Sequence, residues 1–398
     1  MGGSSADRTG PVEYLATDHL REPKVGVAVG LSGGGYRAML FHVGALLRLL
    51  EIGYLEGSGI RDELGGLKRI SSVSGGSITS AALGQSWGKI FFDQHGTRDR
   101  FFETVVEPIR ALASRTIDIP SVVVGLLPFT SASKRIASAY RKYLFDKRTL
   151  TEFPDKPRFV INATNLQSGA LWRFMKPYTR DWKVGEIPKD RKVFEIAVAV
   201  GASSAFPPFL SPVRLRLKST DYTPNSGGKD LDDLQKEPFT TRPILSDGGV
   251  YDNLGLETAW KRFKTILVSD AGGQMAHQGR ISSLWPLQAY RVLNVIDNQV
   301  RSLRKRQVIG SYGDSRTGAY WGIRTNIEHY ELSDALPCPF GKTIILANTP
   351  TRLASLDSSL QERLINWGYA VSDAAIRRHV DDKISAPDGF PYRAEGVG

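Results

Sequence analysis

The chain has 398 residues, of which 41% are hydrophobic and 23% charged, and its formal net charge is +11. This composition is ordinary for a globular protein and argues against intrinsic disorder. The lone cysteine, Cys338, excludes an intrachain disulfide framework. The positive charge favours anionic partners, and because the chain has neither zinc-finger spacing nor an aromatic RNA-binding motif, we expect lipid head groups rather than nucleic acid.

The ends of the chain and the length of its apolar runs indicate where the protein is located. No apolar run approaches the roughly 20 residues needed to span a bilayer, and the first residues, MGGSSADR, contain no apolar secretion core. We therefore predict a cytoplasmic protein that touches membranes only peripherally, with a flexible leader at residues 1–23 and a C-terminal tail at residues 381–398.

Short apolar runs alternate with helix-like patterns along the chain, which favours an α/β sheet. Most of these runs are continuously apolar, as is typical of parallel strands covered by helices on both faces. We predict one domain over residues 24–380, folded as a three-layer α/β/α sandwich with a mainly parallel central sheet. The predicted strands are residues 25–31, 69–73, 159–165, 243–245, 264–269 and 342–347.

Four segments between and after these strands have distinct patterns. Residues 101–153 are helical and amphipathic, and we predict that they form a cap over the site. Residues 217–242 are polar and lack periodicity, which predicts a mobile surface insertion. Residues 287–306 form an amphipathic run that ends in RSLRKR, and this run is either a solvated helix face or a contact for anionic lipid. Residues 353–380 have helical spacing and predict a helix packed on the sheet.

A first glycine turn, SGGGYRAM at residues 32–39, follows the first predicted strand and leads into a helix. Gly33, Gly34 and Gly35 allow a sharp turn and expose successive amide hydrogens at the start of that helix. Such a nest stabilises negative charge. The charge is either a phosphate or the oxyanion that develops when an ester carbonyl is attacked.

The phosphate interpretation has a specific form, because Gly33, Gly35 and Ala38 satisfy the GxGxxG/A dinucleotide pattern. A dinucleotide site also expects an acidic residue at the end of the next strand. Here that strand ends in Val73 and Ser74, without an acid. A dinucleotide-binding oxidoreductase therefore stays only as an alternative.

A second turn, SVSGG at residues 72–76, places Ser74 between Val73 and Gly75. Small neighbours permit the tight strand-turn-helix geometry that exposes a nucleophilic serine at a sheet edge. A purely structural turn explains the same pattern. If Ser74 is a nucleophile, it needs a base nearby.

The best candidate base is Asp247, in SDGGVYDN, at the end of a predicted strand and bounded by glycines. A carboxylate there can take the serine proton directly, although an aspartate that only shapes a turn is the competing interpretation. None of the six histidines stands in a catalytic motif. A Ser-His-Asp esterase that uses His277, His329 or His379 remains open.

The motifs SGGGYRAM, SVSGGS and DGGVYDN, in this order, resemble the patatin-like phospholipases. The SGGG start is closer to their cytosolic phospholipase relatives than to the plant storage proteins. The resemblance includes ASSAFPPFL at residues 202–210 and the strand at residues 160–165, and it spans roughly residues 24–269. This chain departs from the family pattern at Ser72 and Ala38, where the family has glycine.

This resemblance implies a Ser-Asp dyad, with Ser74 as nucleophile and Asp247 as general base. It implies that the amides of Gly33, Gly34 and Gly35 form the oxyanion hole. The implied activity is cleavage of a fatty-acyl ester of a phospholipid or lysophospholipid through an acyl-enzyme intermediate.

The resemblance further implies that Arg37, which follows the glycines, holds the hole or binds a lipid phosphate. We expect no cofactor and no metal, because no cluster of metal ligands is visible in the sequence. Transient contact with an anionic membrane surface is expected, and the need for a protein activator stays open.

Overall fold

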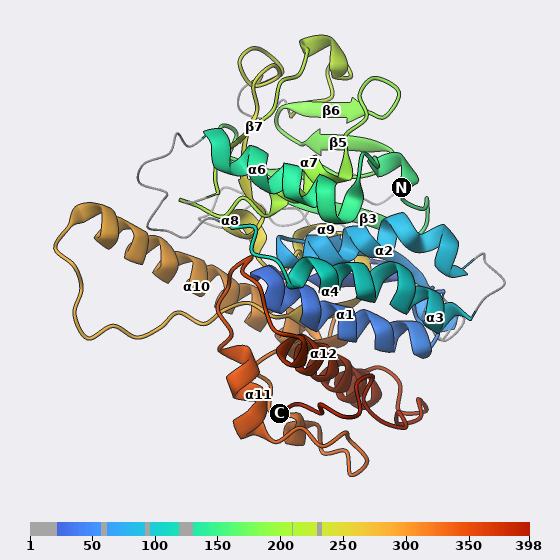
Figure 1. Ribbon diagram of the computed structural model, residues 1–398. Helices are drawn as coiled ribbons and strands as arrows, with labels where there is room; N and C mark the ends of the chain where they lie inside the picture. Colours follow the sequence, from blue (N-terminus) through green and yellow to red (C-terminus); the bar gives the residue numbers. More distant parts are fainter. Residues whose placement is uncertain (1–21, 57–61, 92–95, 119–129, 209, 229–232) are drawn as a thin grey trace, which may run out of the picture.

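The computed structural model describes most of the chain, and a single mixed sheet runs through it (Figure 1). The strand order is β10-β9-β1-β2-β3-β4-β5-β6, and β7 and β8 join beside β3. The described residues are 22–56, 62–91, 96–118, 130–208, 210–228 and 233–398.

Five neighbouring strands form the parallel half of the sheet. They are β1 (Lys24–Leu31), β2 (Leu67–Ser72), β3 (Arg158–Asn165), β9 (Phe263–Asp270) and β10 (Thr317–Gly322). The last residues of β1, β2, β3 and β9 are buried without interruption, as expected for strands covered on both faces.

Five shorter strands form an antiparallel extension. They are β4 (Leu171–Phe174), β5 (Tyr178–Asp181), β6 (Gly185–Pro188), β7 (Val213–Arg214) and β8 (Ile244–Asp247). The predicted α/β fold with a largely parallel centre is confirmed, and this extension is an addition to it.

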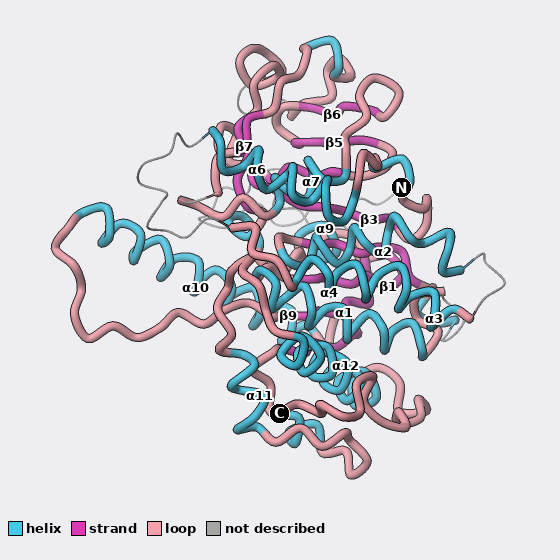
Figure 2. The backbone as a smooth tube through the Cα atoms, viewed as in Figure 1, coloured by secondary structure: helices cyan, strands magenta, loops and turns pink. Residues whose placement is uncertain are grey.

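One face of the sheet is covered by α1 (Gly35–Glu51), α2 (Gly75–Phe91) and α12 (Ser358–His379) (Figures 1 and 2). α1 and α12 meet with their backbones in contact, because a Cβ atom added at Gly44 would lie 1.9 Å from the Ile365 carbonyl oxygen. The helix predicted at residues 353–380 is thus present, and it packs on α1 and β10.

The other face carries α8 (Gly249–Asp252), α9 (Glu257–Trp260) and α10 (Trp285–Ser311). This placement follows from the right-handed crossover rule. The connections from β1 to β2 and from β2 to β3 progress in one direction across the sheet. The connection from β9 to β10 progresses in the other, so α10 lies on the opposite face, where α8 and α9 pack in the same cluster as Val308.

The predicted strand at residues 342–347 is wrong, because these residues lie in α11 (Phe340–Ala347). Thr343, Leu346 and Ala347 are buried, which is helical spacing. A short apolar run does not distinguish a strand from a helix, and the sheet edge is occupied by β10 instead.

The predicted cap, residues 101–153, is mainly helical where it is described. α3 (Thr97–Phe101), η3 (Phe102–Val106) and α4 (Glu107–Ala113) pack against α1 and α2. α6 (Thr130–Tyr140) packs on α7 (Ile196–Ser203). Residues 119–129 lie outside the described residues, so the cap stays a prediction. The remaining short helices are η2 (Asp62–Leu64), η4 (Arg141–Phe145), η5 (Leu150–Glu152), η6 (Ser219–Asp221) and η7 (Ile327–Tyr330).

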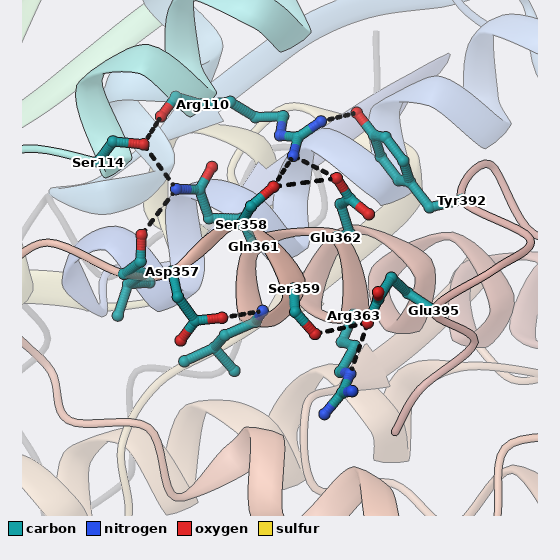
Figure 3. Close-up of polar contacts among 12 residues, drawn as sticks. Arg110, Ser114, Asp357, Ser358, Ser359, Gln361, Glu362, Arg363, Tyr392 and Glu395 are labelled. Carbon is teal, nitrogen blue, oxygen red and sulfur yellow. Dashed lines mark hydrogen bonds and ion pairs between the residues drawn. The ribbon is translucent and has the colours of Figure 1, made fainter.

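The segment after α12 folds back along this helix. The Asn366 side chain donates hydrogen bonds to the carbonyl oxygens of Tyr392 (2.8 Å) and Gly396 (2.7 Å). Figure 3 shows Arg110 of α4 reaching the Tyr392 hydroxyl at 3.1 Å, and Arg363 reaching Glu395 at 3.1 Å. These contacts hold the C-terminal segment against the helical layer.

Candidate active site

β2 and β8 approach each other end to end along one edge of β3. β2 pairs with β3 as far as Ser72 opposite Ile161, and antiparallel β8 ends with Asp247 opposite Ala163. β4 occupies the other edge of β3, so β2 and β8 share the same edge. The sheet register therefore brings Ser74, two residues beyond β2, next to Asp247.

Ser74 stands on a sharp turn between β2 and α2. Its φ angle is 51°, a value that non-glycine residues rarely adopt and that is typical of a strained nucleophile turn. Its amide donates a hydrogen bond to the Ser203 hydroxyl at 3.0 Å. A Cβ atom added at Gly76 would lie 2.6 Å from the Leu31 carbonyl oxygen, so this turn needs glycine there.

Asp247 is buried, with 2% of its surface exposed, and the Ser74 side chain lies close enough to its carboxylate to lower its pKa. Asp247 also accepts a hydrogen bond from the Gly249 amide at 2.7 Å. Burial raises the pKa of Asp247 to about 7, because desolvation outweighs the lowering by the Gly249 amide and the Ser74 side chain. A carboxylate with a pKa near neutrality, in contact with a hydroxyl, is suited to general base catalysis.

The three predicted oxyanion amides are not equivalent. The Gly33 amide donates to the Asn253 carbonyl oxygen at 3.0 Å, so it is already engaged, and its predicted role needs correction. Within the described part of the chain, the amides of Gly34 and Gly35 have no acceptor. Their φ angles, 146° and 63°, are open to glycine and strained for other residues. Of the three predicted oxyanion donors, the amides of Gly34 and Gly35 therefore remain.

Gly75 adds a third amide that the sequence analysis missed. Its backbone touches the glycine turn, because an added Cβ atom would lie 2.2 Å from the Gly35 carbonyl oxygen. The Gly75 amide likewise lacks an acceptor among the described residues. The available signal was its position directly after the nucleophile, where serine hydrolases often place an oxyanion donor.

Arg37 lies beneath the glycine turn and is only 3% exposed. Its Nε and Nη2 atoms donate to the Ala271 carbonyl oxygen at 3.2 and 2.9 Å, and Nη2 also donates to the Thr351 hydroxyl at 2.9 Å. Nη1 donates to the Thr349 carbonyl oxygen. These donors hold the loops that surround Gly34, which favours the predicted role of holding the hole over a contact with a lipid phosphate.

Among the described residues, no histidine is hydrogen-bonded to Ser74. His42 is buried, with Nδ1 at 2.8 Å from the Ser269 hydroxyl and Nε2 at 3.0 Å from the Ser32 carbonyl oxygen. Burial lowers its pKa to about 4, so the ring is neutral. His19 and His95 lie outside the described residues. The other histidines are exposed and unconnected to Ser74: His277, His329 and His379.

Comparison with solved structures gives distant similarities. Human GIVD cytosolic phospholipase A2 matches with a TM-score of 0.49 and 12% identity, over 88% of this chain and 61% of that one. Its complex with methyl gamma-linolenyl fluorophosphonate matches with 0.48 and 15%, over 88% and 57%. VipD from Legionella pneumophila matches with 0.36 and 13%, over 90% and 68%. The chain thus spans about three fifths of the human enzyme.

Comparison with family models is more direct. Among curated proteins, none matches the sequence. The model described as patatin-like phospholipase matches residues 30–260, which is more than half of the chain and includes both glycine turns and Asp247. The chain therefore belongs to the patatin-like phospholipase family.

Proposed function

We propose that this protein is a serine-dependent lipid acyl hydrolase, a phospholipase A or lysophospholipase. The observation that carries the proposal is the proximity of the Ser74 side chain to the carboxylate of buried Asp247, with no imidazole between them. The family assignment supports the lipid substrate. It lends no support to the dinucleotide-binding alternative.

In the proposed reaction, Ser74 Oγ attacks the ester carbonyl carbon while Asp247 accepts the hydroxyl proton. The carbonyl oxygen becomes negative and receives hydrogen bonds from the amides of Gly34, Gly35 and Gly75. When the intermediate collapses, the C–O bond to the lipid alcohol breaks and Asp247 returns the proton to that alcohol. An acyl group remains on Ser74.

Asp247 then takes a proton from water, whose oxygen attacks the acyl-enzyme. Breaking the bond to Ser74 Oγ returns the proton to this oxygen and releases the fatty acid. If another alcohol replaces water, the same steps transfer the acyl group. The balance between hydrolysis and transfer depends on which acceptor reaches the site.

The test is incubation with a panel of phospholipids and lysophospholipids, with mass spectrometry of the released products. We expect Ser74→Ala and Asp247→Asn each to lower turnover by about 10⁴-fold or more, as for other serine nucleophiles and their bases. Ser80→Ala is the matched control, because Ser80 is buried on the same helix and its hydroxyl lacks a partner among the described residues. Full activity in either site variant, or equal loss in the control, contradicts the proposal.

A further inference from the structure

α10 attaches to the molecule mainly through polar side chains, together with Val308, which joins a small apolar cluster. Of its 27 residues, only Val308 and Ser311 are buried. Arg304 forms an ion pair with Glu257 of α9 at 2.8 Å, and the Lys305 ammonium lies over the Tyr320 ring of β10, 4.7 Å from its centroid. These contacts lie in the C-terminal half, and Figure 1 shows the N-terminal half projecting away from the body.

The outer side of this helix is apolar. Seven residues spaced four, three, one, three, four and three apart fall on one stripe at 100° per residue. The large side chains among them are at least 37% exposed, and Trp285 is 77% exposed. We call this set the α10 stripe: Trp285, Ala289, Val292, Leu293, Ile296, Val300 and Leu303.

An ordinary surface helix buries its apolar stripe. α10 does the reverse and exposes it to solvent. Contiguous exposed apolar surface marks an interaction site. The charged residues of α10 indicate which kind of partner binds there. α10 contains five Arg or Lys residues and a single acid, Asp297, which lies off the stripe and close enough to Asp247 to raise its pKa. The exposed cations Arg280 and Arg306 lie before the helix and beside the stripe. An apolar stripe with basic flanks fits an anionic lipid surface.

The attached part of α10 adjoins the proposed site. It contacts α8, which directly follows Asp247. A Cβ atom added at Gly272 would lie 2.5 Å from the Arg301 Nη1 atom, and the preceding residue, Ala271, accepts the hydrogen bonds of Arg37. Val300 and Leu303, which neighbour Arg301 in the sequence, are therefore the part of the stripe nearest the proposed site.

We propose that the α10 stripe docks the protein on an anionic phospholipid bilayer and presents the Ser74 site to that surface. The benefit to catalysis rests on the proposed function, whereas the docking does not. Apolar side chains would enter the boundary between head groups and acyl chains, while the flanking cations bind acidic head groups. Both contributions are required for tight binding.

The experiment measures sedimentation of the full chain with phosphatidylcholine vesicles, with and without phosphatidylserine. Ser74→Ala is used as the parent so that the vesicles stay intact. We expect binding only with phosphatidylserine, weakened by salt, and a loss of about tenfold or more for Leu293→Asp/Ile296→Asp. The matched control is Ile345→Asp, because Ile345 is 68% exposed on α11, away from the stripe.

A second readout is tryptophan emission, which should shift to shorter wavelength on vesicle binding and lose that shift in Trp285→Phe. Equal vesicle binding by the stripe variant and its parent overturns the proposal, as does absence of binding by the parent. Concentration-dependent dimers abolished by Leu293→Asp/Ile296→Asp, without vesicle binding, would instead identify a second copy of the chain as the occupant.

A soluble short-chain ester separates this inference from the proposed function. If the native chain binds vesicles through the stripe but shows no Ser74-dependent cleavage of the ester, the proposed function fails and the docking stands. If it cleaves the ester but binds no vesicle, the docking fails and the proposed function stands.

Discussion

α1 and α10 are two long helices that each follow a strand of the parallel half of the sheet, and they differ in how much of their surface is buried. α1 follows β1 and α10 follows β9, the neighbouring parallel strand, on opposite faces of the sheet. Every residue of α1 from Gly35 to Leu50 is buried, whereas α10 buries only Val308 and Ser311. A helical pattern therefore predicts that a helix forms, but its neighbours decide which side is covered.

The difference comes from what surrounds each helix. α1 lies between the sheet, α2 and α12, and even its Arg48 is buried in an ion pair with Asp373 at 2.8 Å. α10 lies at the β10 edge of the sheet and projects beyond it (Figure 1). The packing around α1 holds the glycine turn in one geometry, whereas the projecting half of α10 exposes a surface that a partner can bind. Five predictions test these two regions.

The largest expected effect is at the start of α1. Gly35→Ala would place a Cβ atom 2.4 Å from the Arg352 carbonyl oxygen at a φ angle of 63°. Because this displaces an oxyanion donor, we expect kcat on a soluble ester to fall by about 10² to 10³-fold, with vesicle binding unchanged. Gly341→Ala on α11, where nothing lies within 4 Å, is the control. Unchanged kcat in Gly35→Ala would remove these amides from the hole.

The second effect is on pH dependence. The pKa of Asp247 is about 7 and the base must be ionised, so kcat/KM should fall about tenfold per pH unit below 7. Asp297 of α10 contributes to this raised pKa. We expect Asp297→Asn to move the acid limb to lower pH, as measured with a soluble ester. A profile flat from pH 5 to 8 would exclude Asp247 as the base.

The same raised pKa has a consequence for stability. The folded chain holds the Asp247 proton more tightly than the unfolded chain, whose aspartates titrate near about 3.9. This contribution is complete below about pH 4 and is lost as the pH rises through about 7. Asp247→Asn should therefore raise Tm at pH 8 relative to the native chain, and less so at pH 4. Equal shifts at both pH values would argue against the raised pKa.

The third effect separates the packed helix from the projecting one. Gly44→Ala puts a methyl group against the backbone of α12, 1.9 Å from the Ile365 carbonyl oxygen, and overpacking of this kind costs about 1–3 kcal/mol. Gly310→Ala on α10 meets nothing within 4 Å, and its higher helix propensity should stabilise by up to about 1 kcal/mol. Urea unfolding measures both. Similar values for the two variants would refute the contrast.

The smallest effect is expected at the attachment of α10. Arg304 and Glu257 are partly exposed, with 23% and 12% of their side chains accessible, so Arg304→Ala should cost about 1 kcal/mol or less. Hydrogen exchange should show faster exchange in α10 and unchanged exchange in α1. Arg306→Ala, an exposed neighbour, is the control. Faster exchange throughout the chain would show that α10 is part of the core.

Local motifs were sufficient to place Ser74 and Asp247, the residues proposed for catalysis, at the ends of strands, because a strand followed by small residues has few possible geometries. The sequence could not show that the Gly33 amide is already engaged or that Arg37 is buried against the loops around Gly34, for a common reason. Their hydrogen-bond partners, Ala271 and Asn253, lie more than 200 residues away in the sequence. The run at residues 342–347 failed because its burial is set by α12, not by its own composition.

The sequence by itself determined the α/β class, the two glycine turns and the order of the residues proposed for catalysis, since each depends on neighbouring residues. Only the tertiary structure decided that β2 and β8 meet beside β3, and that α10 exposes its apolar side. Both outcomes depend on pairing and packing between distant segments, and no local pattern specifies which surface such a partner will cover.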